Sequence, residues 1–139
     1  MDMKYEITFG GGKKVDARVR GFTIRTDQPV ADGGEDAAPG PFELFLASIG
    51  TCAGFYVVSF CQARGIPTDD IRLTQTMIRN DTTHLVDNIN IEILLPADFP
   101  EKYKGAIIKA AESCTVKKHL ASPPAIRIHT RYARRILQG

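Results

Sequence analysis

Alternating apolar and polar residues in the first 27 positions predict three short strands. Tyr5, Ile7 and Phe9 alternate with polar neighbours, which is the two-residue period of a half-buried strand. The same alternation recurs over residues 15–19 and 22–26, and glycines at positions 10–12 and 21 mark the turns between them. We therefore expect an antiparallel meander with one face toward solvent.

A long irregular segment separates this meander from the next element. Residues 28–41 (QPVADGGEDAAPGP) contain three prolines and three glycines, and a loop of this length is usually functional or mobile. Pro41 suits the first turn of a helix. We predict a helix over residues 41–64, ended by Gly65 and Pro67.

The predicted helix contains 18 consecutive residues, 44–61, without a charge, which is the lower edge of the length needed to span a membrane. Its hydrophobicity is modest, because it includes small and polar residues (Ser48, Gly50, Thr51, Gly54 and Ser59). We interpret it as a helix buried on all sides in a soluble protein. A chain this small cannot surround such a helix alone, so we expect a second subunit to help cover it.

The second half of the chain repeats the order of strands followed by a helix. Residues 70–80 and 88–95 are predicted strands joined by a turn at 80–83. Pro100 opens a second helix, whose apolar residues follow the helical spacing from Tyr103 to Cys114. A helical turn over 115–121 and a last strand over 126–130 complete the prediction. Strands grouped in this way indicate an α+β fold, in a single domain over residues 1–139.

Composition narrows the class of protein. The chain has 139 residues and 15.3 kDa, for which area scaling predicts roughly 7,000 Å² exposed of about 22,000 Å² when unfolded. A hydrophobic share of 43 % and a charged share of 24 % exclude a disordered chain. The polar first residues predict no signal peptide, and hence a cytoplasmic protein.

Neither the net charge nor the spacing of the histidines predicts a nucleic-acid or metal partner. The net charge is only +2, so no global field favours nucleic acid. The three histidines (His84, His119 and His129) show no ligand spacing, and we interpret them as structural or solvated. A basic group is interpreted as a solvated surface; it comprises Lys117, Lys118, Arg127, Arg131, Arg134 and Arg135.

Three cysteines carry the candidate chemistry. Their odd number argues against a disulfide framework, and the absence of a CxxC pair argues against zinc. Cys52 lies among small residues between Gly50 and Gly54; these glycines allow either close helix packing or room for a substrate beside the sulfur. If the two helices pack together in the core, Cys52 and Cys114 can meet. Cys61 lies about 13.5 Å along the helix from Cys52, and we interpret it as a packing residue.

The segment 41–52, PFELFLASIGTC, resembles the helix P-x-E-L-x-L-A-x-x-G-x-C of the OsmC/Ohr family. A second mark of that family is a cysteine followed by V-x-x-x-L, which is similar to Cys114 with Val116 and Leu120 here. The order of strands and helices fits over nearly the whole chain. The resemblance implies an OsmC-like fold, with antiparallel strand groups packed on a long central helix and a second helix, in an intertwined homodimer.

The resemblance also implies a thiol peroxidase at the dimer interface, acting in oxidative-stress defence. Cys52 would be the thiol that attacks an organic hydroperoxide, and Cys114 the thiol that resolves the sulfenate into a disulfide. Such a cycle needs no resident cofactor and no metal, but it needs an external dithiol reductant. An apolar pocket around Cys52 would favour small hydrophobic hydroperoxides.

The chain departs from the characterised hydroperoxide reductase branch of this family. That branch pairs an arginine after the first glycine turn with a glutamate ten residues before the reactive cysteine. Phe42 occupies the glutamate position here, and Glu43 is shifted by one. Glu43 could serve the catalytic site, or its negative charge could simply interact favourably with the dipole at the N-terminus of the helix. Candidates for the activating cation are Lys13, Arg18, Arg20 and Arg25, and Tyr56 either lines the pocket or packs.

This departure leaves a second hypothesis open, which is a non-catalytic dimer that binds a small molecule and keeps the OsmC fold. A lowered Cys52 pKa would favour the enzyme, and an ordinary one the binding protein.

Overall fold

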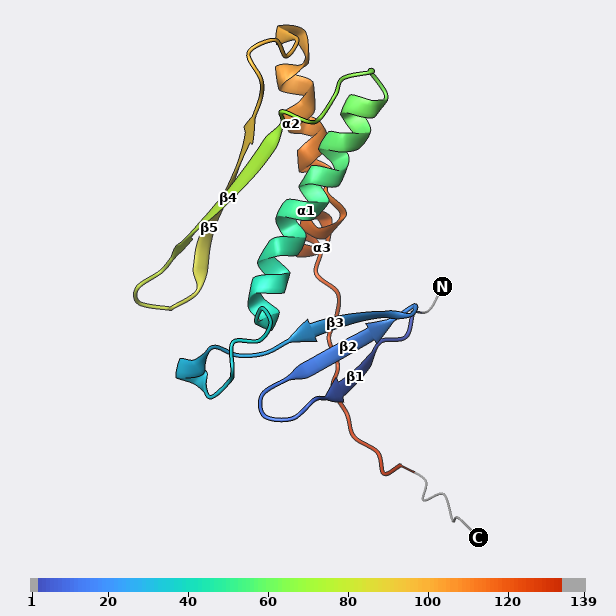
Figure 1. The fold of residues 1–139 in the computed structure, drawn as a ribbon, viewed down its shortest axis with the longest axis vertical. Coiled ribbons are helices and arrows are strands. Elements are labelled where there is room, and N and C mark those ends of the chain that lie inside the picture. Colours follow the sequence, from blue (N-terminus) through green and yellow to red (C-terminus); the bar gives the residue numbers. More distant parts are fainter. Residues whose placement is uncertain (1–2, 134–139) are drawn as a thin grey trace.

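The computed structural model describes residues 3–133 as an α+β protein with antiparallel sheets, so the predicted fold class is confirmed. The meander β1–β3 lies beyond the N-terminal end of the long helix α1, and the hairpin β4–β5 runs beside this helix (Figure 1). The strands are β1 (Glu6–Phe9), β2 (Val15–Val19), β3 (Phe22–Thr26), β4 (Arg72–Arg79) and β5 (Val86–Leu94). The helices are α1 (Pro41–Gln62), α2 (Lys104–Glu112), α3 (Thr115–Ala121) and two 3-10 turns, η1 (Val30–Asp32) and η2 (Glu101–Tyr103).

The β1–β3 meander has the predicted pattern of one apolar and one polar face. Ile7, Ala17 and Ile24 lie side by side in the register of the three strands. On the other face Asp16 pairs with Arg25. The apolar face is itself uncovered, since Phe9 is 84 % exposed and Ile7 56 %.

Helix α1 begins and ends at the predicted signals. Pro41 occupies its first turn, and the Glu43 carboxylate accepts a hydrogen bond of 3.0 Å from the Gly40 N–H. At the other end Gly65 adopts a positive φ of 65°, and the Ile66 N–H donates to the Cys61 carbonyl at 2.9 Å. This arrangement satisfies carbonyls that the helix end leaves free.

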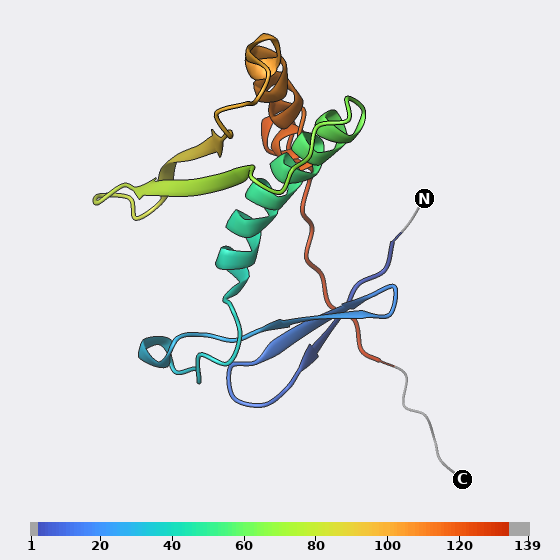
Figure 2. The ribbon, with the colours of Figure 1, turned by 45° about the horizontal axis from the view of Figure 1, so that its top comes forward.

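The core lies where α1 meets α2 and the hairpin. Val57, Cys61 and Ile107 are almost fully buried there, together with Phe60 and Phe99. The far side of α1 is open, and Phe55 is 62 % exposed. The single chain supplies covering elements on one side of α1 only (Figure 2), so burial on all sides, which was predicted with the help of a second subunit, stays a prediction. By length and mean hydropathy alone α1 could span a membrane, a test that core helices of soluble proteins also pass.

The second half of the chain follows the predicted order up to residue 121. The Asn80 side chain accepts hydrogen bonds from the Thr82 and Thr83 N–H groups and so shapes the turn of the β4–β5 hairpin. Pro100 precedes η2 and α2, as its restricted backbone favours. Cys114 then separates α2 from α3.

The predicted strand over 126–130 does not form. Residues 123–133 are extended without a neighbouring strand, and Ile128 is 92 % exposed. The alternation of apolar and polar residues is present, but a strand also needs a neighbour for its N–H and C=O groups. The arginines at 134 and 135, part of the basic group, lie outside the described residues.

The chain exposes more surface than a compact protein of its mass. Its accessible area is 11596 Å², against the roughly 7,000 Å² that scaling predicts. The expectation that two thirds of the surface is buried is therefore wrong for the single chain. The excess comes from the open sides described above: the β1–β3 face, α1 and the extended C-terminal segment.

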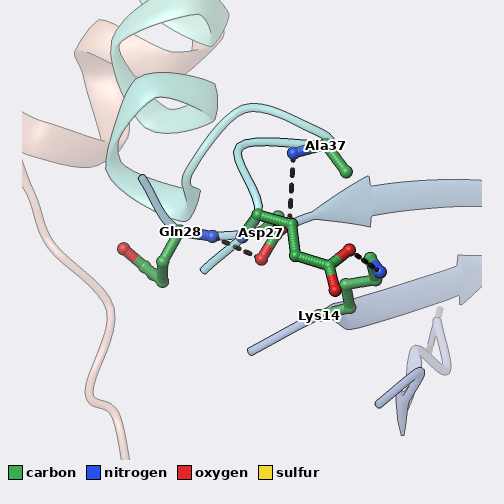
Figure 3. A network of polar contacts seen from close by, with 5 residues as sticks. Lys14, Asp27, Gln28 and Ala37 are labelled. Carbon is green, nitrogen blue, oxygen red and sulfur yellow. Dashed lines mark hydrogen bonds and ion pairs between the residues drawn. The ribbon is translucent and has the colours of Figure 1, made fainter. Parts of the chain in front are cut away.

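The loop that leads into α1 is organised by one buried carboxylate. Asp27 is 1 % exposed and accepts hydrogen bonds from the N–H groups of Gln28 at 2.8 Å, Ala37 at 3.1 Å and Glu35 at 3.3 Å (Figure 3). Beside it, Lys14 pairs with Glu35 at 2.6 Å. A Cβ on Gly34 would collide with the Gln28 carbonyl, so the loop closes tightly there.

Replacing Asp27 by asparagine is expected to lower the melting temperature at neutral pH by several degrees. The Gln28 and Ala37 N–H groups hold the pKa of Asp27 below its ordinary value, although burial alone would raise it. The Glu35 N–H group and the positive charge of Lys14 also lower this pKa. The stabilisation is therefore present above the unfolded-state pKa and is lost as pH falls through the lower folded-state value. Thermal melts at neutral and acid pH should show the variant and the parent converging in acid. Asp36→Asn, at an exposed position of the same loop, is the control, and equal melts for all three proteins at pH 7 would contradict the assignment.

Candidate redox site at Cys52 and Cys114

Two cysteines from distant parts of the sequence meet beside α3. Cys52 is half-buried on α1, and Cys114 is buried at the residue preceding α3. The two thiols are within hydrogen-bonding reach of each other. The sulfur of Cys52 also accepts hydrogen bonds from the N–H groups of Val116 and Thr115. The apolar stripe of the second helix thus brings Cys114 to α1, as its spacing suggested.

These surroundings make the two thiols unequal. Burial opposes ionisation of Cys52, but the Val116 N–H, the Cys114 thiol and the Thr115 N–H outweigh it and lower the pKa of Cys52. Burial raises the pKa of Cys114, and the neighbouring Cys52 raises it further. Because only the thiolate is strongly nucleophilic, these opposite directions make Cys52 the more readily ionised thiol of the pair.

A hydrogen bond between side chains joins the two helices next to this pair. The hydroxyl groups of Tyr56, on α1, and Thr115, the first residue of α3, lie 3.0 Å apart. Tyr56 follows Cys52 by one helical turn, so both lie on the side of α1 that faces α3. Tyr56 was expected to line the pocket or pack; its ring meets that of Phe55 edge-on with centroids 5.3 Å apart, and its hydroxyl bonds to that of Thr115.

The charged residues that the sequence suggested for the site lie away from the Cys52–Cys114 pair in the single chain. Lys13, Arg18, Arg20 and Arg25 all belong to the β1–β3 meander, beyond the N-terminal end of α1 (Figure 1). Arg25 lies 3.9 Å from Asp16, and Arg20 lies over the Phe22 ring. Glu43 caps α1, and Phe42 stacks on Phe45 with ring centroids 5.7 Å apart. The groups that meet the Cys52 sulfur come instead from residues 114–116.

Backbone donors were therefore missed by reasoning from the sequence. Any residue provides an N–H group, so the identities of Thr115 and Val116 gave no signal. The one available clue was position, because a short helix begins directly after Cys114 and leaves its first N–H groups without partners in the helix.

The third cysteine and the histidines have structural surroundings. Cys61 is fully buried in the core, and burial raises the pKa of its thiol despite the nearby Arg64. His119 bonds to the Thr115 carbonyl at 2.7 Å within α3, and His84 adopts a positive φ in the hairpin turn.

An apolar pocket of about 640 Å³ lies on the adjacent face of α1, between β5 and the helices. Ile49 and Ala53 form its floor on α1, and Ile91 and Ile107 are among its walls. Ala53 is the residue after Cys52, and Lys117 follows Val116 at the edge of the pocket. The pocket therefore borders the same turn of α1 and the same start of α3 that hold the cysteine pair.

The α+β scaffold thus brings together a half-buried cysteine on a long helix and a buried cysteine that precedes a short helix. A sequence model of the OsmC-like protein family matches residues 33–129, and the chain belongs to this family. No protein with a curated function matches the sequence.

Solved structures show the same fold at low sequence identity. A protein from Psychrobacter arcticus, described as an osmotic stress induced and detoxification response protein, has 21 % identity and a TM-score of 0.72, covering 85 % of this chain and 88 % of its own. An OsmC-like protein from Mycoplasma pneumoniae has 21 % identity and a TM-score of 0.65, with coverages of 88 % and 91 %. The organic hydroperoxide resistance protein OhrB of Bacillus subtilis has 17 % identity and a TM-score of 0.53, with coverages of 88 % and 93 %. At these identities the likeness concerns the fold alone.

Proposed function

We propose that this protein is a thiol peroxidase that reduces organic hydroperoxides to alcohols in oxidative-stress defence. One observation carries the proposal: the Cys52 sulfur faces two backbone N–H groups and the thiol of Cys114. These donors would stabilise the thiolate, and the neighbouring thiol of Cys114 supports the formation of a disulfide with Cys52. Fold relatives named for organic hydroperoxide resistance support the same reaction class.

The reaction balances with the two cysteines and one external reductant. The Cys52 thiolate attacks one oxygen of the peroxide, the O–O bond breaks, and the alkoxide takes a proton to leave as an alcohol. Cys52 is then a sulfenic acid. The Cys114 sulfur attacks it, water leaves, and a Cys52–Cys114 disulfide forms. A dithiol supplies the two electrons and two protons that restore both thiols, and this requirement suits the reducing cytoplasm.

The substrate we propose is a small hydrophobic hydroperoxide. The pocket on the adjacent face of α1 is lined mainly by isoleucine, alanine and leucine side chains, with Glu92, Lys104, Glu112 and Lys117 among the others; Ala53 brings its lining to the residue next to Cys52. Apolar walls favour an organic group over hydrogen peroxide, which gains nothing from burial. No resident cofactor enters the proposed cycle.

The proposed working form is a homodimer. The accessible area of 11596 Å², the open face of β1–β3 and the unpaired segment 123–133 all call for a covering partner. A second copy would also offer its meander, with Lys13, Arg18, Arg20 and Arg25, as a source of the activating cation. Glu43 enters this proposal only as the cap that begins α1.

A second candidate function is a binding dimer without catalysis. The apolar pocket is the observation that favours it, because a pocket of this volume suits a ligand whether or not Cys52 reacts. An ordinary Cys52 pKa of about 8.5 would support this alternative.

The deciding experiment is an intact mass measurement after one equivalent of cumene hydroperoxide. We expect the reduced protein to lose two hydrogen atoms, with peptide mapping that joins Cys52 to Cys114, and dithiothreitol to restore the starting mass. Cys61→Ala, which changes the cysteine of the core, serves as the control and should oxidise in the same way. A protein whose mass is unchanged after the peroxide treatment would exclude the peroxidase and leave the binding dimer.

A further inference from the structure

Two residues beside the cysteine pair share a contact that the reaction scheme leaves unused. The hydroxyl groups of Tyr56 and Thr115 are 3.0 Å apart, and Tyr56 lies one turn of α1 beyond Cys52. Within the described residues, this is the one hydrogen bond between two side chains that joins α1 directly to α3.

Two hydrogen bonds within the segment also hold the start of α3: the Lys118 N–H donates to the Cys114 carbonyl at 3.1 Å, and the His119 ring bonds to the Thr115 carbonyl at 2.7 Å. The helix has seven residues, no side chain caps its N-terminus, and the Thr115 side chain lies at the surface. Its first N–H groups, from Thr115 and Val116, are nevertheless the donors that the Cys52 sulfur meets. A small displacement of this turn would lengthen both bonds, and hydrogen bonds weaken steeply with poor geometry.

We propose that Tyr56 is a positioning residue, which holds Thr115 so that the first N–H groups of α3 point at the Cys52 sulfur. The inference rests on the proposed function in taking Cys52 as the nucleophile. It adds that the hydrogen bond between the Tyr56 and Thr115 hydroxyl groups raises the reactivity of the Cys52 thiol. Neither hydroxyl group needs to contact the peroxide.

The test is the pH profile of Cys52 alkylation by iodoacetamide, read by mass spectrometry on the peptide that holds Cys52. The titratable group facing Cys52 among the described residues is Cys114, which stays in place in every variant. Tyr56→Phe and Thr115→Val each remove one hydroxyl. Because the thiolate is the reactive form, each should slow alkylation at neutral pH by roughly threefold to tenfold. The profile should move to higher pH in both.

The double variant separates a shared contact from two independent effects. If the hydrogen bond acts as a unit, Tyr56→Phe with Thr115→Val should be no slower than either single variant. Thr115→Ser keeps the hydroxyl and should retain the parent profile. Tyr103→Phe, the same change at the ring that packs on Phe60, is the matched control and should also leave the profile unchanged.

Unchanged alkylation profiles in both single variants, or two effects that add in the double variant, would overturn the proposal. So would loss of a cooperative thermal melt in both single variants, because the contact would then serve folding and not the thiol. The readout uses no peroxide. An inactive peroxidase with the expected alkylation shifts would therefore refute the proposed function and leave the positioning role intact.

Discussion

Cys52→Ser is expected to reduce the turnover of cumene hydroperoxide to the rate seen without protein, a loss of at least roughly a thousandfold. The serine hydroxyl stays protonated, whereas the N–H groups of Val116 and Thr115 lower the pKa of the Cys52 thiol and so favour its thiolate. It also cannot take up the peroxide oxygen as a sulfenic acid does. The measurement is loss of hydroperoxide over time with dithiothreitol as the reductant.

The control for this loss is Cys61→Ala. Cys61 is buried in the core, and its thiol has a raised pKa, so its removal should leave turnover close to the parent value. Full activity in Cys52→Ser, with the Cys61 variant also active, would contradict the assignment of Cys52 as the attacking thiol.

Cys114→Ser is expected to permit one oxidation of each chain and to block the intramolecular disulfide. Cys52 should still attack the peroxide and should stop as a sulfenic acid, because the second sulfur is absent. Intact mass should show the gain of one oxygen atom, and a dimedone adduct should map to Cys52. The serine hydroxyl can donate to the Cys52 sulfur as the Cys114 thiol does, so the first oxidation should proceed at a rate close to that of the parent.

A disulfide that still forms in Cys114→Ser would assign the resolving role to another cysteine. Cys61 is the remaining one in the chain. Its distance along α1 and its full burial make that result unexpected.

Local signals explain why much of the scaffold could be predicted from the sequence. Pro41 and Gly65 bound α1, Asn80 shapes the hairpin turn, and the apolar stripe before Cys114 turns that residue inward. Each of these signals acts within a few residues, so a single sequence contains the information. The meeting of Cys52 and Cys114 follows from the same stripe once the two helices pack together.

The failures have a shared physical cause, which is dependence on neighbours outside the local pattern. The alternation at residues 126–130 is that of a strand, yet no strand of the described chain lies beside it. The burial of α1 on all sides likewise depends on a second subunit, and the single chain covers one side of the helix.

The unequal exposure of Cys52 and Cys114 gives thiol exchange a direction. In the oxidised protein, an incoming dithiol would reach the half-buried Cys52 more readily than Cys114, which is 2 % exposed. Exchange requires approach along the S–S axis from the attacked side. The mixed disulfide would therefore form on Cys52, and Cys114 would depart as the leaving thiolate.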